Sequence, residues 1–168
     1  FRQNDINNGG EGAPLTPIFH SLLKDKFKII NLPLMILNIG GIANGTIISE
    51  NKLSACDVGP GNCLIDHWIR QKSKNKYDEN GSIAKSGKIN KTILDKALNN
   101  WVSYLDSAFP RNFISHDIGD YDYSFANKLS LEDGAATITE YSSEIYSHFI
   151  NKLLINVNPN AVIVCGGG

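Results

Sequence analysis

An acidic residue followed by a glycine-rich turn is the feature of this sequence best suited to chemistry. From Asp57 to Asn62 the chain reads DVGPGN, between a short apolar run and a helical pattern that begins at Cys63. This order places the Asp57 carboxylate at the rim of a sheet and directs the N-terminus of the next helix at the same point, which favours an anionic ligand. Two structural roles are the alternatives: Asp57 can shape the turn through its own backbone, and Asn62 can cap the helix.

A pair of glycines flanked by amides is the second candidate. Gly40 and Gly41 lie between Asn38 and Asn44, in a pattern of apolar and β-branched residues that predicts a β-hairpin. Because glycine has no Cβ, backbone N–H groups of such a turn can approach a phosphate closely. The asparagine amides can bind phosphate oxygens or metal-bound water. A plain hairpin turn is the alternative.

A run of glycines after an apolar strand is the third candidate. Gly166, Gly167 and Gly168 follow Cys165 directly. Three glycines permit the close approach of a flat ligand such as a purine. They serve equally well as a flexible connection.

Other site chemistries have no support in the sequence. No GxxxxGK[ST] or GxGxxG pattern is present, so P-loop and Rossmann interpretations have no support. The acidic stretch over 117–122 lacks regular ligand spacing, so no metal site is expected, and Asp66 is expected to have a solvated or capping role. Three cysteines without a CxxC pattern argue against disulfides and zinc, and Cys63 and Cys165 are expected to pack as small apolar residues. The histidines, expected on the surface or on helix faces, are His20, His67, His116 and His148.

These candidates require a sheet that holds them and helices that return the chain to that sheet. The pattern predicts an α/β fold with a hairpin-containing mixed sheet and crossover helices. Ser130 and Asp133 form a capping-box pattern at the start of the last helix. Strands are expected over 32–38, 46–48, 52–56 and 161–165 (the last one buried), helices over 63–71, 91–104 and 131–154, and irregular connections over 72–90 and 106–124. The buried stripe of the last helix is expected to be Ala135, Ile138, Ser142, Ile145, Phe149 and Leu153.

Composition and charge exclude several classes of partner. The 168 residues, 42% of them hydrophobic and 20% charged, suffice for one domain with a core. A formal net charge of -1 argues against nucleic acid. No apolar run approaches the roughly 20 residues of a membrane span, and the chain does not open like a signal peptide. The cysteine pattern favours a reducing, cytoplasmic location.

Taken in order, the motifs resemble one family, the anhydro-N-acetylmuramic acid kinases of the sugar-kinase/actin-like ATPase superfamily. The resemblance covers most of the chain and is weakest over 103–124. Its motifs are FRQNDI at 1–6, GGEGAPL at 9–15, FH at 19–20, LNIGGIAN at 37–44, DVGPGN at 57–62, YD at 77–78, AKSGK at 84–88 and CGGG at 165–168.

The resemblance implies an actin-like ATPase (ribonuclease H-like) fold and an enzyme of bacterial peptidoglycan recycling. Such enzymes use ATP, with Mg²⁺ expected, and water to convert 1,6-anhydro-N-acetylmuramic acid into N-acetylmuramic acid 6-phosphate. Water attacks the anomeric carbon, the anhydro bond breaks, and the freed O6 takes the γ-phosphoryl group. Asp57 matches the family's base for this water, and Val58 stands where the family has Thr.

The resemblance also implies the binding residues. Phosphate and nucleotide binding falls on Asn38, Gly40, Gly41, Asn44, Gly59, Gly61, Asn62, Gly166, Gly167 and Gly168. For the sugar we expect Arg2, Asp5, Gly12 and Pro14. The fixed charge and the fork of donors of the Arg2 guanidinium suit it as the partner of a carboxylate.

The sequence departs from the family at both ends. The family's Gly-Thr-Ser-x-Asp-Gly phosphate turn is absent from it, as is the nucleotide-binding part that follows the glycine run. We therefore expect residues 1–168 to be the central fragment of a two-domain kinase, without the N-terminal phosphate-binding region and the C-terminal end, and inactive alone.

Two alternatives to a sugar kinase fragment stay open at this point. One is an actin-like nucleotide-binding module without sugar chemistry, and the other is a non-catalytic remnant. The DVGPGN and GGEGAPL segments favour the sugar kinase, because they resemble that family and not the superfamily at large. The expected partners are ATP and a small amino sugar, with a homodimer left open and neither nucleic acid nor membrane.

Overall fold

A four-stranded mixed sheet lies at the centre of the computed structural model, which describes residues 2–9, 19–20, 22, 31–108 and 118–167. The strand order is β3-β2-β1-β4, with β1, β2 and β3 antiparallel and β4 parallel to β1. The predicted hairpin and the α/β architecture are thus confirmed. The strands are β1 (Leu34–Ile39), β2 (Ile42–Ile48), β3 (Leu53–Pro60) and β4 (Ala161–Gly166).

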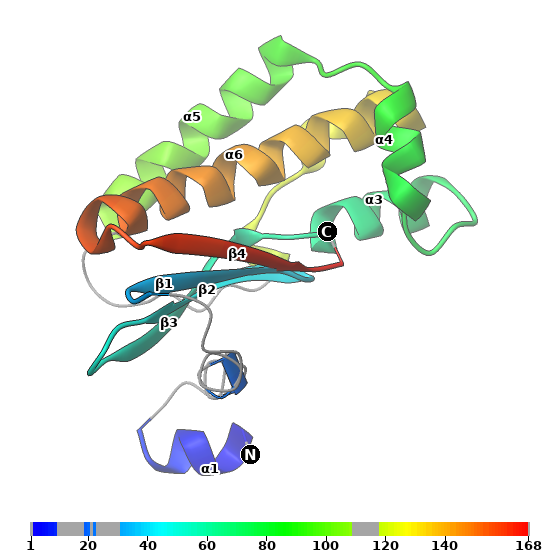
Figure 1. The fold of residues 1–168 in the computed structure, drawn as a ribbon. Helices are drawn as coiled ribbons and strands as arrows, with labels where there is room; N and C mark the ends of the chain where they lie inside the picture. The colour runs from blue at the N-terminus through cyan, green and yellow to red at the C-terminus, as the bar shows by residue number, and fades with distance from the viewer. Residues whose placement is uncertain (1, 10–18, 21, 23–30, 109–117, 168) are drawn as a thin grey trace.

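Helices connect β3 to β4 and cover one face of the sheet. The long helices α5 and α6 lie over that face, α3 and α4 lie toward the end of the sheet where β4 ends, and α1 lies on the opposite side (Figure 1). None of the helices in the described ranges is long and apolar enough to cross a membrane. The helices are α1 (Arg2–Asn7), α3 (Cys63–Lys72), α4 (Ser82–Ser86), α5 (Lys91–Ala108) and α6 (Leu131–Val157), with 3-10 turns η1 (Glu79–Gly81), η2 (Ile118–Asp120) and η3 (Ser124–Ala126).

The main core lies between the sheet and the helices. Met35 and Leu37 alternate with Leu34 and Ile36 along β1, so the first pair faces the helices and the second pair forms a small cluster on the other face. The predicted stripe of α6 is buried throughout. Trp68 of α3 is fully buried, and its indole Nε1 donates to the carbonyl of Leu131 at 2.9 Å.

Two strands differ from the sequence prediction. β3 continues to Pro60, so Asp57 lies within a strand instead of in a turn after it. β4 was predicted to be buried, which is wrong: in the described part of the chain only β1 borders it, and Val164 is 61% exposed. An apolar run does not distinguish a central strand from an edge strand, because both are built from the same β-branched residues.

The helical connections also differ in two places. The stretch over 72–90 holds η1 and α4, elements too short to leave a periodic signal. The capping box at α6 is half formed: Ser130 Oγ accepts from the Asp133 N–H at 3.1 Å, but Asp133 Oδ1 accepts from the Lys88 N–H at 2.8 Å instead of reaching back. The Asp133 carboxylate therefore ties the α4 region to the start of α6.

Candidate active site

Asp57, Asn44, Asn38 and Cys165 form one row across all four strands. In the strand register Asp57 is the partner of Asn44, Asn44 of Asn38, and Asn38 of Cys165. Directly paired residues share a face of a sheet. Their neighbour Val58 belongs to the helix-side core, so the row lies on the face opposite α6. We call these four residues the polar row.

At the β4 end of the polar row, Cys165 lies beside Asn38. The Cys165 thiol lies 4.0 Å from Asn38 Oδ1, at the limit for a hydrogen bond with sulfur. Asp57, Asn44 and Asn38 are half-buried, whereas Cys165 is exposed. The expectation that Cys165 packs as a small apolar residue is therefore wrong. Its strand lies at the sheet edge in the described part, and its side chain lies on the face away from the core.

A β-bulge sits beside Asp57. Ala43 pairs with Gly59 while the next residue, Asn44, pairs with Asp57, so Val58 is an extra residue in β3. Bulges redirect the side chains next to them and are frequent near active sites. Gly59 has a φ of +144°, and a Cβ there would lie 2.8 Å from Cγ2 of Ile145 on α6. The bulge thus fixes the position of Asp57 through the packing of Gly59 on α6.

Replacing Gly59 with Ala should lower the free energy of unfolding by about 2–4 kcal/mol. The new methyl group would press on Ile145 and would also occupy a backbone conformation that side chains disfavour. Chemical denaturation of the variant measures this loss. Gly119→Ala is the matched control, because a Cβ there meets nothing within 4 Å. Equal stability of the two variants would contradict the role given to Gly59.

Three backbone hydrogen bonds join the hairpin turn to the beginning of α3. The carbonyl of Gly40 accepts from the Asn62 N–H at 2.7 Å, and that of Gly41 accepts from the N–H groups of Gly61 and Cys63, each at 3.0 Å. The two glycine motifs therefore form one structural unit, which we call the double turn. The same bonds use N–H groups that we expected to face an anion, so the start of α3 offers fewer donors than the sequence suggested.

The side chain of Asn62 does not cap α3. Asn62 stands at the N-cap position but makes no side-chain capping hydrogen bond, and its backbone is already helical. The capping alternative is thus wrong for this residue.

The glycines of the candidate motifs fall into two groups. A Cβ at Gly61 would collide with the Gly40 carbonyl, and one at Gly166, whose φ is +113°, would collide with the backbone of Ile39. Close backbone contacts explain these two glycines without a ligand. Contacts within the protein do not explain Gly41 and Gly167, because nothing lies within 4 Å of a Cβ placed at either position.

A cleft of about 960 Å³ opens beside the double turn, between α3, the η1–α4 region, α6 and the residue after β4. Asn62 and Gly167 both line it. So does Asp66, which we expected to have a solvated or capping role. Asp66 is half-buried, and burial raises the pKa of its carboxyl, with Arg70 offsetting only part of the shift. The periodicity of α3 could not indicate this, because it does not show what lies beyond the helix.

The YD and AKSGK motifs build one wall of this cleft. Both carboxylate oxygens of Asp78 accept from backbone N–H groups that begin α4, those of Ile83 at 2.8 Å and Ala84 at 2.9 Å. A Cβ at Gly87 would collide with the carbonyl of Glu132, so the end of α4 packs directly on α6. The motifs therefore shape the cleft through backbone contacts.

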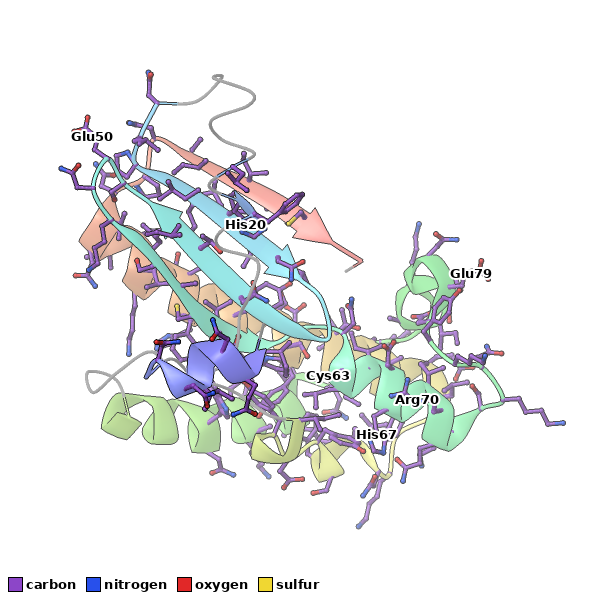
Figure 2. All side chains as sticks on the ribbon, turned by 90° about the horizontal axis from the view of Figure 1, so that it is seen from below. His20, Glu50, Cys63, His67, Arg70 and Glu79 are labelled. Atoms are coloured by element: carbon purple, nitrogen blue, oxygen red, sulfur yellow. The ribbon has the colours of Figure 1, made fainter. Side chains whose placement is uncertain are left out.

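His20 is buried, contrary to the expectation for the histidines. Its Nδ1 lies 3.0 Å from Oγ1 of Thr46, which is also buried, and burial lowers the pKa of the imidazole. Thr46 is two residues beyond Asn44 on β2, so the pair lies on the same face as the polar row. Figure 2 shows His20 against the sheet, away from His67 and Arg70 on α3.

The remaining site expectations have mixed outcomes. Cys56, next to Asp57, is buried on the helix side, and burial and the Asp57 charge raise the pKa of its thiol to about 12. Cys63 is half-buried. Among the described residues, no group of three or more His, Cys, Asp or Glu side chains could hold a metal ion.

Gly12, Pro14 and Gly168 lie outside the described residues, as do the side chains of Arg2 and Asp5, whose backbone belongs to α1.

A mixed sheet that carries a hairpin, crossover helices and an acid beside glycine turns corresponds to an incomplete sugar-kinase/actin-like ATPase fold. Comparison with known proteins narrows this class. The model of the family described as anhydro-N-acetylmuramic acid kinase matches residues 1–168, and the chain belongs to that family.

Curated relatives agree with the family match. The chain is 47% identical to an anhydro-N-acetylmuramic acid kinase of Pelagibacter ubique and 39% identical to one of Zymomonas mobilis. Both alignments cover 100% of this chain but only 45% and 44% of the two relatives. The chain therefore spans less than half the length of these relatives.

Proposed function

We propose that this chain is the central part of a two-domain kinase that converts 1,6-anhydro-N-acetylmuramic acid, ATP and water into N-acetylmuramic acid 6-phosphate and ADP. The observation that carries the proposal is the position of Asp57. It lies in the polar row, beside the bulge. Its strand, β3, pairs with β2, which begins directly after the turn of Gly40 and Gly41. A proton acceptor and a phosphate-binding turn are the two groups that this reaction requires.

In the proposed mechanism Asp57 is the general base. Its carboxylate takes a proton from a water molecule as the water oxygen bonds to the anomeric carbon of the sugar. The bond between that carbon and O6 breaks, and its electron pair stays on O6. O6 then attacks the γ-phosphorus of ATP, and ADP leaves. The pKa of Cys56, raised to about 12, keeps that neighbouring thiol protonated, so it does not compete as a nucleophile.

ATP is proposed to lie with its phosphates at the double turn and its nucleoside in the cleft. The residues proposed to face the phosphates are Asn38, Gly40, Gly41, Asn44 and Asn62, with Gly59 and Gly61 setting the backbone. Asn62 supports this orientation, because it belongs to the double turn and also lines the cleft. Gly167 lines the cleft as well, so the run Gly166, Gly167 and Gly168 would form the nucleoside end.

The sugar is proposed to lie on the face that carries the polar row. α1, with Arg2 and Asp5, lies on this side of the sheet (Figure 1). The buried His20 contacts Thr46 of β2 on the same face. Arg2, Asp5, Gly12 and Pro14 are therefore proposed to bind the sugar, with Arg2 facing its carboxylate.

The setting of the enzyme is proposed from the family and the sequence. Mg²⁺ commonly binds through substrate phosphates with only one or two protein carboxylates, so we expect it to arrive with ATP. A cytoplasmic place in peptidoglycan recycling fits the cysteine pattern and the substrate.

The function is tested in a completed enzyme, in which residues 1–168 replace the aligned part of the Pelagibacter ubique relative. Incubation with the anhydro sugar and ATP should yield the 6-phosphorylated sugar and ADP in equal amounts. ATP hydrolysis without a sugar product would instead favour a nucleotide-binding module without sugar chemistry.

Replacing Gly41 with Val in the completed enzyme should raise the KM for ATP by about 10- to 10²-fold. A Cβ placed there meets nothing within 4 Å, so the fold should persist while the side chain keeps phosphate from the backbone. Gly119→Val makes the same change at an equally open glycine and should leave the KM for ATP unchanged. A wild-type KM for the Gly41 variant would mean that the turn is an ordinary hairpin.

A further inference from the structure

The cleft beside the double turn has an acidic lining, which is unusual for a site expected to receive part of a polyanion. Four carboxylates line it, against a single lysine, Lys85. The phosphates of a nucleotide would be repelled there, whereas hydroxyl and amino groups would find acceptors. The acids are Asp66, Asp78, Glu79 and Glu140.

One of these four carboxylates has a structural role among the described residues. Asp78 accepts the backbone N–H groups of Ile83 and Ala84 and thereby caps α4. Asp66 has no such capping role: it lies in the first turn of α3, one helical turn beyond Asn62, and its own N–H donates to the Asn62 carbonyl at 2.9 Å. Arg70, one turn further on, directs an N–H to the carbonyl of Lys76 at 3.2 Å.

The spacing along α3 relates Asp66 to the double turn. Residues four apart lie on one side of a helix, about 6 Å from each other. In the proposed nucleotide site the phosphates lie at the double turn and the base lies in the cleft. The ribose, which connects them, would therefore lie beside Asp66. A half-buried carboxylate gains most from hydroxyl donors, because burial has removed part of its water.

We propose that Asp66 accepts a hydrogen bond from a ribose hydroxyl of ATP and so makes the enzyme prefer ATP to a nucleotide that lacks this hydroxyl. This inference rests on the proposed nucleotide site and assigns a residue that the sequence motifs did not include. Glu140, which lines the same cleft from α6, would contribute a second acceptor.

The test compares ATP with 2′-deoxy-ATP and 3′-deoxy-ATP in the completed enzyme. The wild type should have a KM about 10-fold or more higher for at least one of the deoxynucleotides than for ATP. Asp66→Asn is nearly isosteric and should raise the KM for ATP by a similar factor. The KM of the Asp66→Asn variant for that deoxynucleotide should stay within about twofold of the wild-type value. The hydroxyl and the carboxylate are the two partners of one hydrogen bond, so removing the second partner has no further effect.

The control and the contrary outcomes separate this inference from the proposed function. Asp95→Asn, on the exposed side of α5, should change none of the KM values. Equal KM values for all three nucleotides in the wild type would overturn the inference, as would an Asp66→Asn variant that weakens all three equally. Either result leaves the kinase activity standing. If no nucleotide supports formation of the phosphorylated sugar, the proposed function itself fails.

Glu140→Gln gives an independent measurement if Asp66→Asn does not fold. The discrimination that the wild type shows between ATP and the deoxynucleotides must then persist in a folded Glu140→Gln variant. Its complete loss would assign the ribose to Glu140 and overturn the assignment to Asp66.

Discussion

Replacing Asp57 with Asn in the completed enzyme is expected to lower kcat by about 10²- to 10⁴-fold, with the KM for ATP and the thermal stability nearly unchanged. The two side chains have almost the same shape, so the bulge and the pairing with Asn44 should persist. An amide, however, cannot take a proton from water. The loss would exceed this range if Asp57 also orients the water toward the anomeric carbon.

A control and two contrary outcomes make this expectation sharp. Asp95→Asn changes an exposed carboxylate on α5 and should leave kcat unchanged. Asp66 cannot serve as this control, because it lines the cleft. A kcat close to wild type would remove Asp57 from the mechanism. A lower kcat together with a clear loss of thermal stability would mean that Asp57 shapes the strand and that the base lies elsewhere.

Replacing Gly61 with Ala should be more damaging than the same replacement at Gly59 or Gly41. The new methyl group would collide with the carbonyl of Gly40, and a backbone group cannot rotate away as a side chain can. Overpacking and the loss of the bonds between the turn and α3 together predict a loss of about 3–5 kcal/mol in the free energy of unfolding. The KM for ATP should rise as well, because the turn and Asn62 would separate.

Chemical denaturation and ATP kinetics of the same variant test both consequences. Gly41→Ala is the control for stability, since that neighbouring glycine of the double turn has open space around it. If Gly61→Ala were as stable as Gly41→Ala, the contact between the turn and α3 could not be as close as described.

The sequence predicted the parts of this fold that depend on local periodicity. The hairpin around Gly40 and Gly41, helix α3 and the buried stripe of α6 all follow from the spacing of apolar residues, which burial on one face enforces. The motifs likewise identified the family, which the comparisons confirm.

What could not be predicted depends on contacts between distant segments. The polar row requires the strand order, and a sequence does not show that Asn38 will have Cys165 as its neighbour on β4. Asp66 looked like a surface residue because the wall opposite it is built by α4 and α6. His20 looked unremarkable because its partner, Thr46, is 26 residues away. In each case the environment is set by tertiary packing and not by spacing.

The fate of solvent oxygen in a single turnover tests the central claim most directly. The completed enzyme and its Asp57→Asn variant are mixed with the anhydro sugar and ATP in H₂¹⁸O, and the product is reduced at once with borohydride to fix the oxygen on the anomeric carbon. We predict that the wild type places one ¹⁸O on that carbon and none in the phosphate, and that the variant forms this product at least about 10²-fold more slowly. Label in the phosphate, or labelling of the sugar by Asp57→Asn at the wild-type rate, would contradict the assignment of Asp57 as the base that activates water.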